Sequence, residues 1–308
     1  MLDFPAMATY DALEWERLTD ELRNFEEIAG FVNPSPGEIP RLQGIDVHGM
    51  VLPLRHVIGG DHVLYVDFEN RFELDVRIEE AVRGGRPEIA SRLQGLRRRA
   101  GILVADVSGH RMTDALIAAM LHQAFLLGAH YELDLYGEIT TRIFEHVNSR
   151  FHRTNSFHKY VTMIYGEIWD DGRFRFISAG HQPPSVFSRE FGRFMPIDAS
   201  RLVTFPPVGM LPSLTGREPR GKAAPRGFKK RYQVNEIHLL SPGDILLLLT
   251  DGLSEHGGGE YFPGRVERLL ADSGEASAEE ICGRLRDDLV GYAPPQDDVS
   301  FVVVKKTR

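Results

Sequence analysis

The sequence predicts an α+β fold, in which antiparallel sheets form a layered sandwich with helices packed outside. Three observations indicate this fold. Short strand-like runs stand between helical patterns without forming regular strand–helix–strand units. Two of these runs, YVTMIYGEIW and RFRFISA, are joined by Asp170-Asp171-Gly172, which is a strong hairpin signal. Along the chain hairpins outnumber crossovers, and this favours antiparallel over parallel sheets.

The first 40 residues are expected to form a helical appendage. In residues 10–32, apolar side chains recur every three to five positions with charged residues between them, which predicts one amphipathic helix. The segment NPSPGEIPRL, residues 33–42, then breaks the helix with prolines and a glycine. We therefore divide the chain into this appendage, residues 1–40, and a main domain, residues 41–308. Two interpretations of the helix stay open: it packs on its own core, or it mediates a homodimer or relays a signal.

The main domain is predicted to begin with two strands, IDVHGMVLPL and HVLYVDF, and a helical stretch, IEEAVRGGRPEIASRLQGLRRR. A buried strand, GILVADV, and two helices, TDALIAAMLHQAFLLG and GEITTRIFEHVNSRF, precede the hairpin. Strands are then expected around 184–188, 193–197, 201–205, 232–240 and 244–250, helices at 261–271 and 277–290, and a last strand at VSFVVVKK. Residues 206–231 are rich in Pro, Gly and basic residues and should form a long loop, either a solvated insertion or a substrate-docking flap.

Composition excludes several classes of function. The net charge is -8, so no basic field is available to bind nucleic acid. The single cysteine, Cys282, excludes an internal disulfide, and its apolar helical position predicts a small buried hydrophobe. The N-terminus lacks the basic start and apolar core of a signal peptide, and no apolar run approaches the roughly 20 residues of a membrane helix. We expect a cytoplasmic protein with no membrane partner.

Acidic residues mark the ends of several predicted strands. They are Asp61 after Gly59-Gly60, Asp106 at the end of GILVAD, Asp251 at the end of ILLLLTD, and Asp297 and Asp298 before VSFVVV. A carboxylate at the end of a buried strand is costly unless it is paired or binds a metal. If these aspartates converge, a divalent cation resolves their repulsion, and oxygen ligands favour Mg²⁺ or Mn²⁺ over zinc. Each alone is also explained as a turn former or a helix cap, as for Asp106 with Ser108.

Six motifs taken in order resemble the PPM-type metal-dependent serine/threonine phosphatases (protein phosphatase type 2C). The resemblance is strongest to the bacterial branch named after stage II sporulation protein E. The motifs are IGGD at 58–61, DVSGH at 106–110, SAGHQPP at 178–184, PPVGM at 206–210, LSPGDILLLLTDGLSE at 240–255 and DDVSFVVVK at 297–305. One such motif is weak evidence, but six in this order are strong, and they span about residues 41–308.

The resemblance implies a pair of antiparallel sheets flanked by helices, a four-layer α-β-β-α sandwich, with a two-metal site at one end. Carried over by position, the metal ligands would be Asp61, Asp106, the Val107 carbonyl, Asp251 and Asp297, with Asp298 as a weaker candidate. The implied activity is that of a phosphoprotein phosphatase, which hydrolyses phosphoserine or phosphothreonine with water activated by two Mn²⁺ or Mg²⁺ ions. The implied partner is a phosphorylated regulatory protein, such as an anti-sigma-factor antagonist.

Some positions depart from the branch pattern or have no settled role. His110 and His181 are candidate proton donors by type, although a histidine in a glycine-flanked turn often only bonds backbone. Arg111 stands where the branch usually has glycine, and Leu64 where it often has a second aspartate, with Asp67 further on. Neither departure removes an expected ligand, so we expect an active enzyme. The alternative hypothesis is a catalytically inactive regulator that keeps the phosphatase fold and binds a partner.

Overall fold

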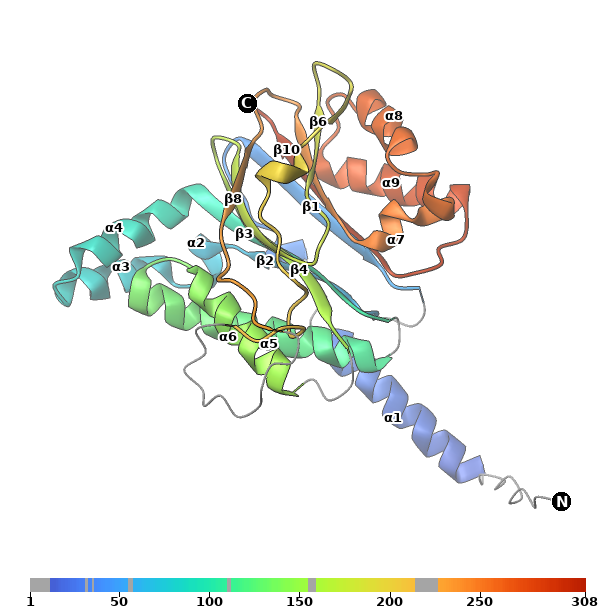
Figure 1. The fold of residues 1–308 in the computed structure, drawn as a ribbon, viewed down its shortest axis with the longest axis horizontal. Coiled ribbons are helices and arrows are strands. Elements are labelled where there is room, and N and C mark those ends of the chain that lie inside the picture. Colours follow the sequence, from blue (N-terminus) through green and yellow to red (C-terminus); the bar gives the residue numbers. More distant parts are fainter. Residues whose placement is uncertain are drawn as a thin grey trace.

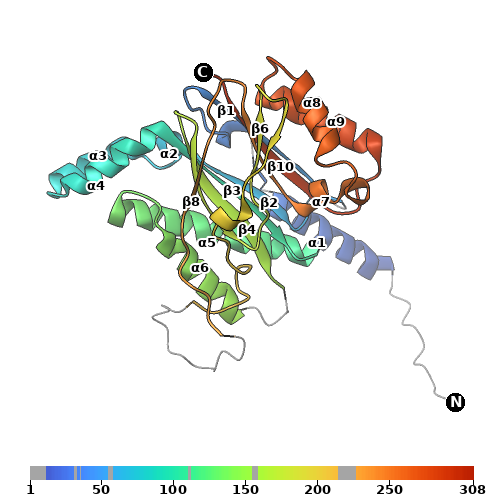
Figure 2. The ribbon, with the colours of Figure 1, turned by 45° about the horizontal axis from the view of Figure 1, so that its top comes forward.

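The computed structural model describes residues 12–30, 33–34, 36–54, 58–109, 112–154, 159–213 and 227–308. It has four layers: two β-sheets stacked face to face, with helices against each outer face (Figure 1, Figure 2). The predicted α+β fold, a four-layer α-β-β-α sandwich, is confirmed.

Each sheet has five strands, and all neighbouring strands are antiparallel. The first sheet has the order β1 (Ile45–Leu52), β10 (Val299–Lys306), β9 (Ile245–Leu249), β6 (Ser185–Ser188) and β7 (Arg193–Met195). The second sheet has the order β2 (Asp61–Val66), β3 (Arg99–Val107), β4 (Val161–Trp169), β5 (Arg173–Ala179) and β8 (Asn235–His238).

Burial on both faces explains the apolar character of the central strands. In β3, Ile102 and Val104 point between the sheets, where they join an apolar cluster with Leu246 of β9. The alternate residues Leu103 and Ala105 point outward and join the cluster beneath the helices. Because successive side chains of a strand point to opposite faces, a strand covered on both sides needs a near-continuous apolar run. The same reason accounts for ILLLL in β9.

The helices form the two outer layers and the N-terminal extension. They are α1 (Ala12–Gly30), α2 (Phe68–Arg71), α3 (Leu74–Arg83), α4 (Pro87–Gly95), α5 (Met112–Tyr136), α6 (Thr141–Thr154), α7 (Asp251–Ser254), α8 (Gly264–Asp272) and α9 (Ala278–Tyr292). Side chains of α3 to α6 pack on the second sheet, and those of α8 and α9 pack on the first. Within the described residues, no helix combines the length and the apolar character needed to cross a membrane.

Most predicted elements occur, with one error in the middle of the chain. The Asp170–Gly172 turn joins β4 to β5, and Gly172 has a φ of +92°, which favours glycine. The prediction of a strand at 201–205 is wrong. The main chain of Val203 is hydrogen-bonded to the Asn235 side chain instead of to a neighbouring strand. That side chain accepts from the Val203 N–H at 2.8 Å and donates to the Val203 carbonyl at 2.9 Å. Residues 214–226 of the predicted long loop lie outside the described residues.

Helix α1 extends away from the sandwich and touches it near its C-terminal end (Figure 1). There Phe25 packs against Ile58 and Ala115, the latter in the first turn of α5. This is the amphipathic helix that the sequence predicts, although the domain boundary at residue 40 stays a prediction.

Candidate metal centre

Four strand ends bring the predicted carboxylates to one end of the sandwich. In the second sheet, β2 begins at Asp61 and β3 ends just after Asp106, and the two residues are directly paired across the strands. In the first sheet, β9 ends just before Asp251 and β10 begins just after Asp298. Antiparallel pairing therefore gathers residues that are up to 237 positions apart, as counted from Asp61 to Asp298.

A hydrogen bond joins the two sheets at Asp61. The Thr250 hydroxyl, which follows β9, donates to Asp61 Oδ2 at 2.7 Å and accepts from the Ser300 N–H of β10 at 2.9 Å. Both Asp61 and Thr250 are buried. Because a buried hydroxyl and carboxylate each need a partner, this bond fixes the Asp61 side chain against the first sheet.

Asp298 forms a second link between the sheets. Its Oδ1 accepts from the Leu54 N–H and its Oδ2 from the Gly60 N–H, both at 2.7 Å. The side chain is buried. Its position before β10 thus anchors the segment that leads into β2. Asp298 stays a candidate ligand, but each of its oxygens already accepts a main-chain hydrogen bond.

The Val107 carbonyl, the predicted main-chain ligand, lies against Gly60. A Cβ added to Gly60 would stand 2.7 Å from the Val107 oxygen and 2.5 Å from the Gly109 oxygen. Any side chain at residue 60 would therefore displace the turn after β3. Glycine at this place in IGGD keeps the two carbonyls beside Asp61.

The remaining two aspartates face solvent. Asp251 and Asp297 are both exposed, while Asp106 is partly buried and Asp61 is fully buried. The Asp297 Oδ1 accepts from the Asp298 N–H at 2.8 Å. The carboxylates thus run from the interior to the surface, so the outer side of the group is open to a substrate.

Mutual repulsion and burial raise the pKa of three of these carboxyls. Burial raises the pKa of Asp61 well above its usual value, and Asp106 adds to the effect. Burial, then the charges of Asp251 and Asp297, raise the pKa of Asp106 to about 7. Burial and Asp297 also raise the pKa of Asp251. Such a group is unfavourable as several bare anions, and cations or protons would relieve it.

The donor chemistry fits hard divalent cations. All the predicted ligands are oxygens, which suit Mg²⁺ and Mn²⁺. In the described part of the chain, however, no three Asp, Glu, His or Cys side chains are already gathered around one point. The carboxylates are neighbours that raise one another's pKa, and side-chain movements would be needed to close them on an ion.

A comparison with protein-family models decides the family. The model described as Stage II sporulation protein E (SpoIIE) matches residues 97–307, which is more than half of the chain. The chain belongs to the SpoIIE family.

Two curated relatives and a solved structure are similar to this SpoIIE-family chain. It is 23% identical over 211 residues to the phosphoserine phosphatase RsbU of Bacillus subtilis, and 33% identical over 159 residues to the phosphoserine phosphatase RsbP of the same organism. The matches cover 67% and 51% of this chain but only 55% and 34% of those proteins. The SiaA-PP2C domain of Pseudomonas aeruginosa superposes with a TM-score of 0.59 at 17% identity, over 96% of this chain and 99% of that one, which shows the fold.

Three residues of this SpoIIE-family site were missed from the sequence. Besides Thr250, they are Asp114 at the start of α5 and Lys159 before β4, which form an ion pair at 2.8 Å. Lys159 also donates to the Ser108 carbonyl at 2.6 Å, so the pair supports the turn that follows Val107. Asp114 stands in the first turn of α5, where acidic residues are common, and its partner is distant in sequence, so no local pattern indicates the pair.

The other positions singled out from the sequence have different outcomes. His181 is buried, and burial lowers its pKa to about 4, so it is neutral near pH 7 and bonds the Thr162 hydroxyl at 2.9 Å. Asp67 caps α2 by accepting from the Asn70 N–H at 3.2 Å, and Leu64 is buried beneath the helices. The Ser108 hydroxyl accepts a hydrogen bond from the Tyr160 N–H at 3.2 Å, just before the start of β4. His110 and Arg111 lie outside the described residues.

Replacing Asp106 by Asn should stabilise the metal-free protein. Because the Asp106 pKa is raised, its contribution to the free energy of unfolding is fully present below the unfolded pKa of about 4 and is lost as pH rises through about 7. In EDTA at pH 8 we expect Asp106→Asn to melt at least about 3 °C above wild type, with a smaller gap at pH 5.5. Thermal unfolding at both pH values measures this. A variant that melts at or below wild type at pH 8 would show that the carboxylates do not repel.

Proposed function

We propose that this chain is a metal-dependent protein serine/threonine phosphatase that hydrolyses phosphoserine or phosphothreonine. The observation that carries the proposal is the convergence of Asp61, Asp106, Asp251 and Asp297 at one end of the sandwich, in a SpoIIE-family chain. The two relatives RsbU and RsbP bear the name phosphoserine phosphatase, which supports the same activity here.

The residues that would hold two Mn²⁺ or Mg²⁺ ions are Asp61, Asp106, Asp251, Asp297 and the Val107 carbonyl, with Asp298 at the edge. When bound, two such cations supply a Lewis acid for the phosphate and an activated water as the nucleophile. The chain itself contributes by holding these oxygen atoms in place. Asp61 is held by Thr250, the Val107 carbonyl is held by the turn at Gly60, and the exposed Asp251 and Asp297 stand where a phosphoprotein can approach.

The single cysteine of the chain does not offer a nucleophile at the site. Cys282 lies in α9, is buried, and donates to the His48 carbonyl at 3.4 Å. Burial raises its thiol pKa to about 12, so the thiolate is scarce at neutral pH. Direct attack by water is therefore the mechanism that we propose.

The substrate that we propose is a phosphorylated regulatory protein, such as an anti-sigma-factor antagonist. The open, exposed side of the carboxylate group suits a phosphoserine presented on a folded protein, because a narrow pocket would exclude one. The identity of that protein is best sought with phosphorylated candidates rather than free phosphoserine.

Phosphatase activity should require Asp251 and tolerate the loss of Asp67. With Mn²⁺ and p-nitrophenyl phosphate, Asp251→Asn should lower kcat/KM at least about 100-fold, because it removes a ligand charge at the reacting phosphate. Asp67→Asn is the matched control, since it changes an aspartate that caps α2, and asparagine caps equally well. Phosphate release measured for both variants, and for wild type in EDTA, tests the proposal.

If wild type releases no phosphate from p-nitrophenyl phosphate or from a phosphoserine protein with either Mn²⁺ or Mg²⁺, the phosphatase proposal fails. The inactive partner-binding regulator would then be the better description.

Thr250 should control metal affinity through Asp61. Thr250→Val removes the hydroxyl that donates to Asp61 Oδ2 at 2.7 Å and keeps the shape of the side chain. We expect the Mn²⁺ concentration for half-maximal activity to rise about 10-fold or more, as is typical when a partner of a metal ligand is lost. Thr250→Ser should restore wild-type Mn²⁺ dependence. An unchanged Mn²⁺ titration for Thr250→Val would show that Asp61 is not a ligand.

We further propose a homodimer in which α1 of each copy is an interface element. Four of its apolar side chains are 43% to 68% exposed: Trp15, Leu18, Leu22 and Ile28. Helix α5 is apolar over much of its length and exposes a second stripe, formed by Leu116, Met120, Leu127, Tyr131 and Leu135. A long exposed apolar stripe marks an interaction surface, so a second copy offers each stripe a partner.

Charge favours the pairing of α1 with the α5–α6 side of the other copy. Helix α1 carries six acidic residues and two arginines. The surface beside the α5 stripe has Arg142, His146 and Arg150 at successive turns of α6, where they line a groove together with Tyr131 and Leu135. Opposite charges at the rim steer such an association.

The double variant Leu18→Glu/Leu22→Glu should be a monomer if wild type is a dimer. Multi-angle light scattering on the full chain measures the mass of each. Val290→Glu is the control, because Val290 is equally exposed but lies on α9. A monomeric wild type, or a double variant that stays dimeric, would contradict this interface.

A further inference from the structure

The last residue of β3, Val107, carries the carbonyl that we propose as a metal ligand. The Val107 N–H donates to the Gly60 carbonyl at 3.2 Å, and the Val107 carbonyl lies beside the same glycine. The peptide group that contains this carbonyl also contains the Ser108 N–H, which donates to the Tyr160 carbonyl at 3.0 Å. A trans peptide group is planar, and its N–H and C=O point in opposite directions. The bond to Tyr160 therefore directs the Val107 carbonyl away from β4 and toward Gly60.

A lysine holds the next peptide group of this turn. Lys159 donates from Nζ to the Ser108 carbonyl at 2.6 Å, and the Ser108 hydroxyl accepts from the Tyr160 N–H at 3.2 Å. The N–H, carbonyl and hydroxyl of Ser108 thus all bond to Lys159 or Tyr160, the two residues immediately before β4. Three bonds to one residue fix the two peptide groups that it joins, and the first of these carries the Val107 oxygen.

Asp114 supplies the charge that keeps Lys159 in this position. Its side chain is fully buried in the first turn of α5, and its Oδ1 lies 2.8 Å from the Lys159 Nζ. A buried carboxylate is costly without a partner of opposite charge, so the pair has one favoured arrangement. Asp114 also lies near the carboxylate group. Burial is the largest cause of the raised pKa of Asp106, and the charge of Asp114 adds to the effect.

Gly109 leaves the space that this ion pair occupies. It has a φ of +114°, which favours glycine. A Cβ added to Gly109 would stand 2.6 Å from the Lys159 Nζ and 2.7 Å from the Asp114 Oδ2. The turn at residues 107–109 is therefore held between Gly60 on one side and the ion pair on the other.

We propose that Lys159 and Asp114 are positioning residues that set the affinity of the centre for Mn²⁺ or Mg²⁺, because they hold the Val107 carbonyl in place as a ligand. This role rests on the proposed function of the carboxylate group as a metal centre. A positive charge near the carboxylates by itself disfavours a bound cation. Position and charge therefore predict opposite effects on metal affinity when the lysine is replaced.

The Mn²⁺ affinity of Lys159→Met separates these two effects. The unbound ion gives an EPR signal, so Mn²⁺ is titrated into the full chain without substrate. We expect Lys159→Met to bind Mn²⁺ at least about 10-fold more weakly than wild type, as is typical when the support of a metal ligand is lost. The loss of a positive charge alone would instead tighten binding. A variant that binds Mn²⁺ as tightly as wild type, or more tightly, would overturn the proposal.

Asp114→Asn tests the other member of the pair. It keeps the shape of the side chain and removes the charge that holds Lys159, so Mn²⁺ should bind at least about fivefold more weakly. If Asp114 acts through Lys159, the two effects are not additive. The double variant Asp114→Asn/Lys159→Met should then bind Mn²⁺ within about twofold of Lys159→Met. An unchanged affinity in Asp114→Asn, or a larger loss in the double variant, would contradict this linkage.

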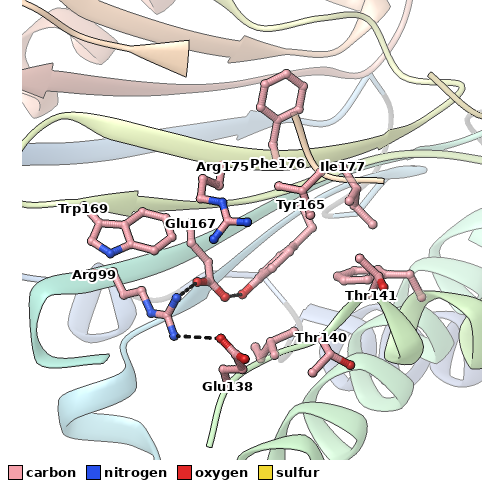
Figure 3. Close-up of a pocket in the computed structure, with 13 residues that line it drawn as sticks. Arg99, Glu138, Thr140, Thr141, Tyr165, Glu167, Trp169, Arg175, Phe176 and Ile177 are labelled. Atoms are coloured by element: carbon pink, nitrogen blue, oxygen red, sulfur yellow. Dashed lines mark hydrogen bonds and ion pairs between the residues drawn. The ribbon is translucent and has the colours of Figure 1, made fainter. Parts of the chain in front are cut away.

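The ion pair at the opposite end of β3 provides matched controls (Figure 3). The Arg99 Nη1 lies 2.9 Å from Glu167 Oε2, and both side chains are less than a tenth exposed. β3 begins at Arg99 and reaches Asp106 seven residues later, which separates the two ends by about 20 Å. Arg99→Met and Glu167→Gln should lower the melting temperature, because they break a buried pair, but should bind Mn²⁺ within about twofold of wild type. If they weaken Mn²⁺ binding as much as Lys159→Met does, general destabilisation explains the effect and the proposal fails.

Thermal unfolding in EDTA identifies the variants that are folded. If Lys159→Met does not fold, Asp114→Asn and its control Glu167→Gln decide the question. The titration also separates this proposal from the phosphatase proposal. A wild type that binds Mn²⁺ but releases no phosphate contradicts only the phosphatase activity, whereas a wild type that binds no Mn²⁺ contradicts both.

Discussion

The hydrogen bond between Thr250 and Asp61 is the interaction on which the candidate centre depends. Asp61 begins a strand of the second sheet, and Thr250 directly follows a strand of the first. The apolar core fixes the distance between the sheets but not their alignment, because apolar packing is non-directional. A short polar contact between buried groups has one geometry. It therefore helps to set how the strand ends of the two sheets face each other. The predicted ligands lie at these strand ends, so their relative positions depend on it.

The same end of the sandwich carries an electrostatic cost that the rest of the fold must offset. Burial and the nearby carboxylates together raise the pKa of Asp106 to about 7. The strands behind them are buried on both faces, so the main chain cannot move apart without exposing a large apolar area. A rigid scaffold of this kind holds like charges together, which an exposed loop could not do. That is the physical reason for strands that end on an acid.

The sequence predicted the layers, and the aspartates at the strand ends, because both follow from local patterns. Apolar runs reveal strands, and an aspartate at the end of such a run is visible without any structure. The Thr250 contact and the Asp114–Lys159 pair each join residues that are far apart in the chain. Their types are common, so no spacing marked them. The strand expected at 201–205 failed for a related reason, because a distant side chain, Asn235, took its main-chain partners.

The adjacent residues Asp297 and Asp298 show how one motif divides into two roles. Immediately before β10, the Asp297 carboxylate is exposed and the Asp298 carboxylate is buried. Asp298 accepts two main-chain N–H groups from the segment before β2, and its own N–H donates to Asp297. The buried aspartate thus positions the exposed one. Such a fixed neighbour holds an exposed carboxylate in place, since an exposed side chain alone would sample many rotamers. The pair thus divides into a buried anchor and an exposed carboxylate, and the exposed one is the residue that we propose as a metal ligand.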